Sequence, residues 1–190
     1  MKNNKKFLVN LLIWLSFSIT IVLFSYAFAA KPGASTGGYV MGGIGPGGGI
    51  IFHLTDDGKK GLEAAPEDQG AGKWHNNEFI TTNAAKSGIN GGNFNTERII
   101  SNQGIGFYAA LVAANYNGGG YGDWYLPSND ELNLMYKNLH LQSLGGFANG
   151  SYWSSTEHDG DNAWFQNYSF GSMDIEMKST SFRIRPIRAF

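Results

Sequence analysis

Oxygen-bearing side chains gather in a short stretch near the C-terminal end of the sequence. Glu157, Asp159 and Asp161 alternate along it, Asn162 follows, and Gly160 permits a sharp turn. Carboxylate oxygens at every second position are ligands that calcium takes in proteins, although the EF-hand spacing and its final glutamate are missing. Two interpretations stay open: a solvated acidic turn, or a calcium site with Glu157, Asp159 and Asp161 as ligands. No other cofactor is predicted.

The residues after this turn predict a strand that binds a ligand. Side chains alternate along a strand, so Trp164, Gln166 and Tyr168 share one face, and Phe165 and Asn167 share the other. Aromatic rings interleaved with amides are typical of surfaces that meet a carbohydrate or a protein. The alternative is that Trp164 is a core residue. The predicted ligand-binding residues are Glu157, Asp159, Asp161, Asn162, Trp164, Gln166, Asn167 and Tyr168.

Three arginines near the C-terminus, Arg183, Arg185 and Arg188, form the basic cluster of the sequence. Forked guanidinium groups bind sulfate and carboxylate well, which would suit a sulfated glycan. The structural interpretation is that they fasten the last strand through ion pairs. Their expected partners are Asp123, Glu131 or Asp174.

The residue types that usually carry catalysis are missing or scattered. The sequence contains no cysteine, and its four histidines lie far apart without metal-ligand spacing. Gly43, Gly45 and Gly48 fit a dinucleotide-binding pattern, but an apolar strand follows them where that motif needs a helix. We therefore predict a protein that is not an enzyme and has no catalytic residues.

A helix must position the strands that carry these side chains, and the sequence predicts where this helix begins. Trp124 belongs to a short extended piece, and Pro127 keeps the residue before it out of helical geometry. Ser128 and Glu131 then form a capping box at the first turn of a helix. We expect this structural joint of Trp124, Pro127, Ser128 and Glu131 to define the fold and not to carry chemistry.

The remaining elements indicate an α+β fold with short helices, small antiparallel sheets and many loops. A hairpin is predicted at 49–66 with its turn at Asp57 and Gly58, and 71–93 is predicted to be a loop pinned by Trp74 and Phe79. Helices are expected at 95–103, where Asn95 would be the N-cap, and at 107–116. Period-two patterns predict strands at 151–157, 162–170, 173–178 and 181–190, joined in one antiparallel sheet.

The N-terminal residues are of another kind. Residues 1–29 combine a basic start, an apolar run and a small-residue cleavage pattern, which predicts a signal peptide; an uncleaved membrane anchor is the alternative. Residues 30–38 are expected to be a flexible lead-in, and 39–190 a single domain. Without the three lysines of the signal, 11 basic residues face 15 acidic ones. This acidic balance argues against nucleic acid as a partner.

Five stretches carry a resemblance to a known family. They are "GPGGGIIFHL" with "GLEAAPED", "DWYLPSNDELNLMY", "YWSSTE" and "FRIRPIRAF", which span most of 39–190. Together they resemble the C-terminal domain family of the Legionella collagen-like (Lcl) adhesins. The resemblance implies a C-type-lectin-like fold, distantly similar to formylglycine-generating enzymes, and binding of glycans outside the cell. Formylglycine chemistry relies on cysteines, and this sequence has none.

The sequence therefore predicts a secreted or surface-exposed bacterial adhesion module, with the periplasm as another location, that recognises a glycan, sulfated or not, or a protein. Three alternatives stay open: an extracytoplasmic enzyme of changed chemistry on a formylglycine-enzyme-like scaffold, a ligand-binding protein diversified by a retroelement, and a structural envelope protein. A membrane is a partner only if the signal stays uncleaved. The ligand and the oligomeric state are not fixed by the sequence.

Overall fold

The computed structural model describes residues 38–55 and 57–190. The predicted signal peptide at 1–29 and nearly all of the predicted lead-in at 30–38 lie outside these residues. Within the described part of the chain, no helix combines the length and the apolar character needed to cross a bilayer.

In the described part of the chain, eight strands form two separate sheets. The smaller sheet has the order β1-β2-β8 and is made of β1 (Ile50–Leu54), β2 (Gly61–Ala64) and β8 (Ile187–Ala189). The larger has the order β3-β7-β4-β5-β6 and is made of β3 (Ala71–Gly72), β7 (Phe182–Arg183), β4 (Ser151–Glu157), β5 (Asn162–Asn167) and β6 (Met173–Met177). The predicted hairpin is confirmed as the antiparallel pair β1 and β2.

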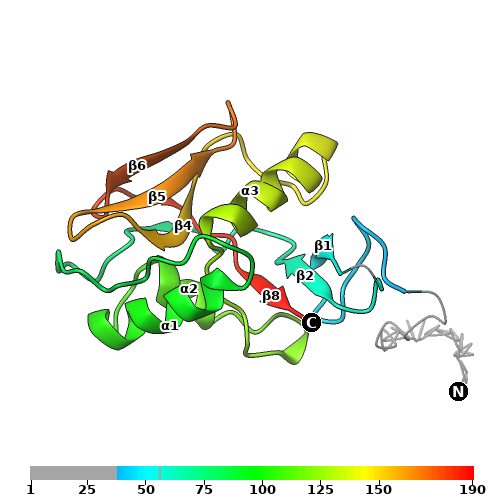
Figure 1. Cartoon of the computed structure of the whole chain (residues 1–190), viewed down its shortest axis with the longest axis horizontal. Helices are drawn as coiled ribbons and strands as arrows, with labels where there is room; N and C mark the ends of the chain where they lie inside the picture. Colours follow the sequence, from blue (N-terminus) through cyan, green and yellow to red (C-terminus); the bar gives the residue numbers. More distant parts are fainter. Residues whose placement is uncertain (1–37, 56) are drawn as a thin grey trace, which may run out of the picture. The chain divides into compact units, whose positions relative to one another are not determined.

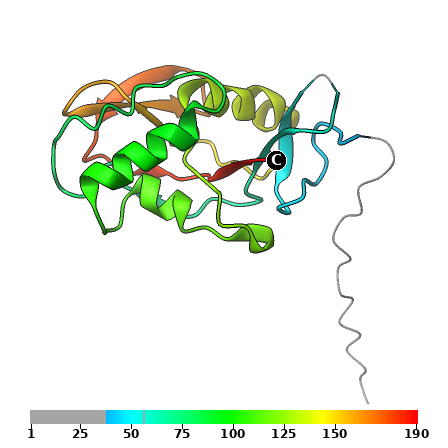
Figure 2. The ribbon, with the colours of Figure 1, turned by 60° about the horizontal axis from the view of Figure 1, so that its bottom comes forward.

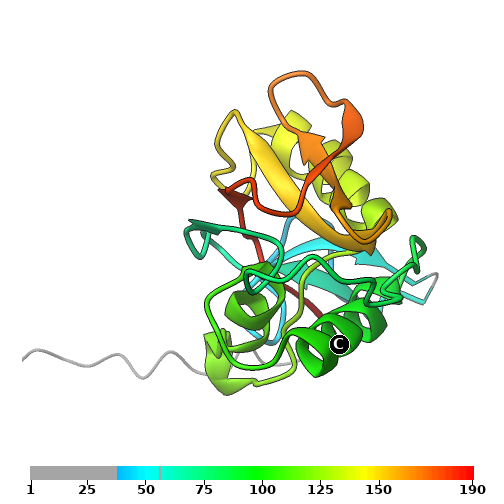
Figure 3. The same cartoon turned by 90° about the vertical axis from the view of Figure 1, so that its left-hand side faces the viewer.

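Helices lie on both faces of the larger sheet. α3 (Asn129–Asn138) packs against β4 and β5 on one face, while α1 (Gly91–Gln103) and α2 (Ala109–Ala114) pack together below the other, as Figures 1 and 3 show. Figure 2 brings α1 and α2 forward and leaves the sheet behind them. Two short 3-10 turns, η1 (Gly118–Gly120) and η2 (His140–Gln142), complete the described elements. The predicted α+β class is confirmed.

The central strand β4 contributes side chains to two hydrophobic cores. Tyr152 packs with Phe52, Leu132 and Tyr168 in the core between α3 and the smaller sheet, whereas its neighbour Trp153 packs with residues of α1 and α2 on the opposite face. Both side chains are fully buried. Because successive residues of a strand point to opposite faces, one strand can anchor both layers of helices.

The last predicted strand, 181–190, is divided between the two sheets. β7 pairs with β3 and β4, Pro186 interrupts the run, and β8 pairs with β2. Proline has no N–H for a ladder, and the carbonyl oxygen of Pro186 instead accepts a hydrogen bond from Ala65 N–H. β7 also runs parallel to β4, so the larger sheet is mixed and the prediction of a single antiparallel sheet was wrong.

Two further predictions about the loop and first helix need correction. α1 begins at Gly91, and Asn95 is buried inside it, where its side chain accepts from Lys86 N–H and donates to the Lys86 carbonyl oxygen. Asn95 therefore holds the preceding loop and is not an N-cap. Trp74 pins that loop as predicted, with Nε1 donating to the Ser154 carbonyl oxygen, but Phe79 is exposed.

The glycine-rich segment before β1 wraps around a buried carboxylate. Gly47 and Gly49 donate their backbone N–H groups to Glu63, at 2.9 Å each for the shorter contacts. A Cβ atom on Gly47 would lie 2.7 Å from a Glu63 oxygen, so glycine is needed for this close approach. The glycine-rich segment that contains the dinucleotide-like pattern thus binds a side chain of the protein itself, through Gly47 and Gly49.

The predicted capping box is confirmed, and its glutamate does more than cap α3. Glu131 Oε2 accepts from Ser128 N–H at 2.8 Å, and Ser128 Oγ accepts from Glu131 N–H at 3.4 Å. The same buried carboxylate accepts from Asn90 N–H at 2.7 Å and Gly92 N–H at 3.2 Å, at the start of α1. Burial raises the pKa of Glu131, and the backbone N–H donors oppose that rise. One carboxylate therefore binds the N-termini of two helices.

Replacing Glu131 by glutamine should reveal this double role. Glu131→Gln keeps the shape but turns one acceptor oxygen into an NH2 group that faces N–H donors, so we expect the free energy of unfolding to fall by about 2–3 kcal/mol. Urea unfolding followed by circular dichroism measures the change. The matched control is Asp130→Asn on the exposed neighbour, which should change stability by less than about 0.5 kcal/mol. Equal losses in the two variants would contradict the assignment.

Candidate functional site

The acidic turn at 158–161, between β4 and β5, is organised by Asp159. Its Oδ1 accepts from the N–H groups of Asp161 at 2.8 Å and Asn162 at 2.7 Å, and from Asn162 Nδ2 at 3.1 Å. Its Oδ2 lies 2.9 Å from His158 Nδ1. The hydrogen bonds from the Asn162 side chain, His158 and the two backbone N–H groups lower the pKa of Asp159. This carboxylate is therefore occupied in shaping the turn.

Glu157 belongs to the interior and not to the surface of the turn. Its carboxylate accepts from the N–H groups of Thr82 at 2.8 Å and Asn83 at 2.7 Å, and it forms an ion pair with Lys178 at 2.7 Å. Both members of the pair are almost completely inaccessible to solvent. The prediction that Glu157 contacts a ligand was wrong, because this residue fastens the 73–83 loop to the sheet.

The ammonium group of Lys178 is surrounded by oxygen acceptors. Its Nζ donates to Glu157 Oε1 at 2.7 Å, to the Gly160 carbonyl oxygen at 2.9 Å and to the Ile80 carbonyl oxygen at 3.0 Å. The ammonium group also lies 4.7 Å from the Trp74 ring centroid. We call it the tethered cation. Lys178 was missed at the sequence level, because a lysine after a strand is usually a solvated residue.

The three predicted calcium ligands do not converge. Glu157 faces the tethered cation, Asp159 closes its own turn, and Asp161 is exposed. In the ranges 38–55 and 57–190, no three histidine, aspartate or glutamate side chains are arranged to hold a metal ion. The structure therefore does not bring Glu157, Asp159 and Asp161 together, and calcium binding stays a prediction.

Helix α3 covers part of the strand face that was predicted to meet a ligand. Gln166 is buried and donates to Asn133 Oδ1 at 3.1 Å and to the Gly171 carbonyl oxygen at 3.2 Å. Tyr168 is also buried, and its hydroxyl donates to the Leu132 carbonyl oxygen at 2.9 Å. The prediction that Gln166 and Tyr168 contact a ligand was wrong. The alternation of side chains assigned them to the correct face of the strand, but it does not predict that a helix covers that face.

Trp164 lies on the same face beyond the part that buries Gln166, and it is half-buried. Its ring centroid is 5.9 Å from that of His158. Across the ladder it pairs with Ile175 of β6, and Met177 follows on the same side of the sheet. Ile175 is 37% exposed and Met177 50% exposed. We call Trp164, Ile175 and Met177, with the adjoining turn at 158–161, the β5–β6 face.

Five of the predicted ligand-binding residues stay accessible. They are Asp159, Asp161, Asn162, Trp164 and Asn167. Asn167 uses its Oδ1 to accept from Ser169 N–H at 2.9 Å and so shapes the turn after β5. Sequence reasoning missed Ile175 and Met177, although the alternation of apolar and acidic residues at 173–177 predicted their strand. What the alternation could not give is the place of β6 at the edge of the sheet, which depends on distant pairing.

The arginines are used in ion pairs inside the fold. Arg185 binds Asp68 at 2.7 Å, and Arg188 binds Glu63 at 3.0 Å and also contacts Asp123. Arg183 is exposed and approaches Asp68 at 3.4 Å. The structural interpretation is confirmed, with Asp123 as an expected partner. The other two expected partners, Glu131 and Asp174, instead bind backbone N–H groups.

Comparison with known proteins identifies the family. The family described as "Lcl C-terminal domain" matches residues 68–188, which is more than half of the chain. The chain belongs to the Lcl C-terminal domain family. The resemblance drawn from the sequence is thereby confirmed, while the C-type-lectin-like fold and glycan binding that it implies stay predictions.

Beyond the family, the similarities are remote. No curated protein matches this Lcl C-terminal domain protein. A solved structure of a fimbrial protein from Bacteroides ovatus aligns with a TM-score of 0.49 at 15% sequence identity, over 67% of this chain and 35% of that one. The chain thus spans about a third of the length of the structure it matches.

The tethered cation predicts how the Lcl domain responds to calcium. Because the ammonium of Lys178 already occupies the oxygen-lined position, we expect millimolar calcium to leave the melting temperature unchanged. Differential scanning calorimetry with calcium and with a chelator measures this, and magnesium at equal ionic strength is the control. A melting temperature that rises with calcium alone would show that the turn binds the ion after all.

The two members of the buried pair should contribute to stability in a coupled way. Lys178→Met leaves the Glu157 charge buried without its cation, and we expect a loss of about 3–5 kcal/mol in the free energy of unfolding. In the double variant Lys178→Met/Glu157→Gln the loss should be smaller than the sum of the single losses. Lys60→Met, on an exposed lysine, is the control. Additive losses measured by urea unfolding would mean that the pair contributes no coupling.

Proposed function

We propose that this chain is a non-catalytic binding module that acts outside the cytoplasm and recognises a glycan or a protein through the β5–β6 face. The observation that carries the proposal is the continuity of Trp164, Ile175 and Met177 on one open side of the sheet, next to the acidic turn. The proposed C-type-lectin-like fold and exported location rest on the family resemblance and on the signal peptide predicted from the sequence.

The chemistry of the β5–β6 face supports binding. Single exposed apolar side chains are common, but neighbouring ones on paired strands form a patch, and such patches mark interaction sites. The Trp164 ring offers a flat surface with an indole edge, and methionine adapts to irregular partners. Asp161 and Asn162 at the border can form the hydrogen bonds that fix the orientation of a ligand.

The charges around the face argue for a ligand without dense negative charge. Asp159 and Asp161 lie in the acidic turn at the border of the face, and Asp174 and Glu176 alternate with its apolar residues along the edge strand β6. The arginines that would suit sulfate groups are held by Asp68, Glu63 and Asp123. A sulfated glycan would meet like charges here, so an uncharged glycan or a protein fits the face better.

A rigid support is a further argument for recognition. The turn is closed by the Asp159 hydrogen bonds, and its base is held by the tethered cation through the Gly160 carbonyl oxygen. Side chains that are already positioned lose little freedom on binding, which leaves more of the contact energy for affinity.

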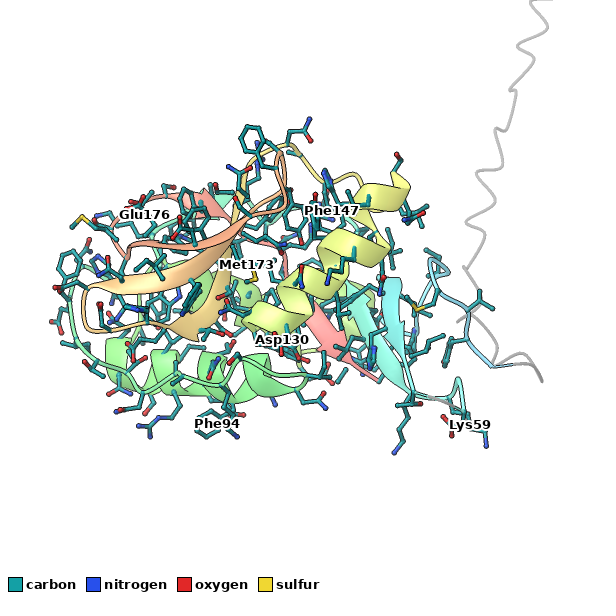
Figure 4. The ribbon with its side chains drawn as sticks, turned by 45° about the horizontal axis from the view of Figure 1, so that its top comes forward. Lys59, Phe94, Asp130, Phe147, Met173 and Glu176 are labelled. Carbon is teal, nitrogen blue, oxygen red and sulfur yellow. The ribbon has the colours of Figure 1, made fainter. Side chains whose placement is uncertain are left out.

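Two substitutions test the proposed function. In a screen of uncharged and sulfated glycans together with extracellular and envelope proteins, we expect Trp164→Ala and Asp161→Ala to weaken the strongest interaction about tenfold or more. Surface plasmon resonance measures the affinities, and near-ultraviolet circular dichroism checks that the fold is kept. The control is Phe94→Ala, an exposed aromatic residue on α1 that Figure 4 shows away from the sheet. Unchanged affinity in both face variants would remove this surface from the proposal.

A further inference from the structure

The outer strand β6 offers an unpaired backbone edge. Among residues 38–55 and 57–190, its only partner strand is β5. Beyond the strand ends, Asn167 N–H donates to the Ser172 carbonyl oxygen and Lys178 N–H donates to the Asp161 carbonyl oxygen. Hydrogen-bonded pairs alternate along an antiparallel ladder, so Asp174 and Glu176 direct their backbone groups to β5. Ile175 and Met177 therefore direct theirs to the free edge.

Carboxylates cover this edge. The N–H of Ile175 donates to Asp174 Oδ1 at 2.8 Å, and the N–H of Met177 donates to Glu176 Oε1 at 2.8 Å. The outward donors of Ile175 and Met177 thus each bind the side chain of the preceding residue. An acidic cover of this kind hinders neutral or acidic strands from pairing. Their carbonyl oxygens must displace a charged acceptor, and such strands offer no cation to pair with the released carboxylate.

The two faces of β6 differ in chemistry. Met173, Ile175 and Met177 point to the side of Trp164, and Asp174 and Glu176 alternate with them. Figure 4 places Met173 beside α3 and Glu176 toward the other end of the strand. An added strand would therefore meet apolar side chains on one face and carboxylates on the other.

The geometry points to one class of partner: an extended segment of a basic polypeptide, with apolar residues alternating with lysine or arginine, that adds to the sheet beside β6. Its carbonyl oxygens replace the carboxylates at the N–H groups of Ile175 and Met177. The released side chains of Asp174 and Glu176 then pair with its cations, and its apolar residues pack on the β5–β6 face. This inference rests on the proposed function, because it names the ligand of the same face.

A second copy of the chain fits the edge less well. Pairing two β6 strands about Ile175 would set Asp174 of one copy opposite Glu176 of the other. Like charges directly opposite across a ladder are unfavourable. A basic polypeptide would be attracted by these carboxylates, so it fits the edge better than a second copy of the chain.

Peptide titrations into the nitrogen-15-labelled full chain test the inference. The probes are three capped hexapeptides in which valine alternates with lysine, glutamine or glutamate. We expect the lysine peptide to bind about tenfold more tightly than the glutamine peptide, and the glutamate peptide not to bind. Binding of the lysine peptide should shift the amide signals of Ile175 and Met177 and slow their hydrogen exchange. Its affinity should fall with added salt.

Matched variants separate the edge from the face. Asp174→Asn/Glu176→Gln should abolish the preference for lysine, and Ile175→Lys should abolish binding of the lysine peptide. Asp130→Asn/Glu97→Gln makes the same chemical changes at exposed acidic residues elsewhere and should bind as the wild type does.

Three results would overturn strand addition: no amide shift at millimolar lysine peptide, equal affinity for the three peptides, or self-association through β6 in sedimentation. The proposed function fails separately, when the natural ligand binds Trp164→Ala as it binds the wild type. A ligand that needs Trp164 but ignores the two β6 variants would leave the proposed function in place and refute the added strand.

Discussion

Three buried glutamates hold this fold together by binding backbone N–H groups of distant loops. Glu63 binds the glycine-rich segment before β1, Glu131 binds the start of α1 as well as that of α3, and Glu157 binds the loop that precedes α1. Charged acceptors make stronger hydrogen bonds than neutral ones, and a buried carboxylate is costly unless all its oxygens are satisfied. Each of these loops is therefore held in the one conformation that brings its N–H groups to the carboxylate. A chain with 27 glycines and no cysteine needs such constraints, because ordering its backbone is expensive and no disulfide can help.

The local parts of this scheme could be read from the sequence, and the distant parts could not. Ser128 and Glu131 are three residues apart, and their reciprocal hydrogen bonds follow from spacing alone. The hydrogen bonds of Glu131 with Asn90 and Gly92 depend on where α1 packs, and the residues near Glu131 in the sequence do not predict them. The α+β class and five of the strands followed from hydrophobic periodicity. The division of 181–190 between two sheets did not, because period two is the same on either side of Pro186.

The candidate site shows the same limit. Alternation placed Trp164, Gln166 and Tyr168 on one face correctly, but burial of that face is set by α3, which enters from another part of the chain. Glu157 looked like a surface ligand because its partner Lys178 lies 21 residues away across a hairpin. Polar residues in a turn have two uses, binding something outside or closing the turn itself. Asp159 closes the turn and Asp161 is exposed, and only the three-dimensional structure distinguishes the two.

The lysine at the base of the acidic turn has a consequence for the conditions under which the domain keeps its form. A bound ion has a dissociation constant, so its site empties when the surroundings are dilute or contain a competing chelator. An ammonium group joined to the chain by its own side chain has an effective concentration that no dilution changes. The base of the turn is thereby held without an ion from the surroundings, and this contact is in place as soon as the polypeptide has folded.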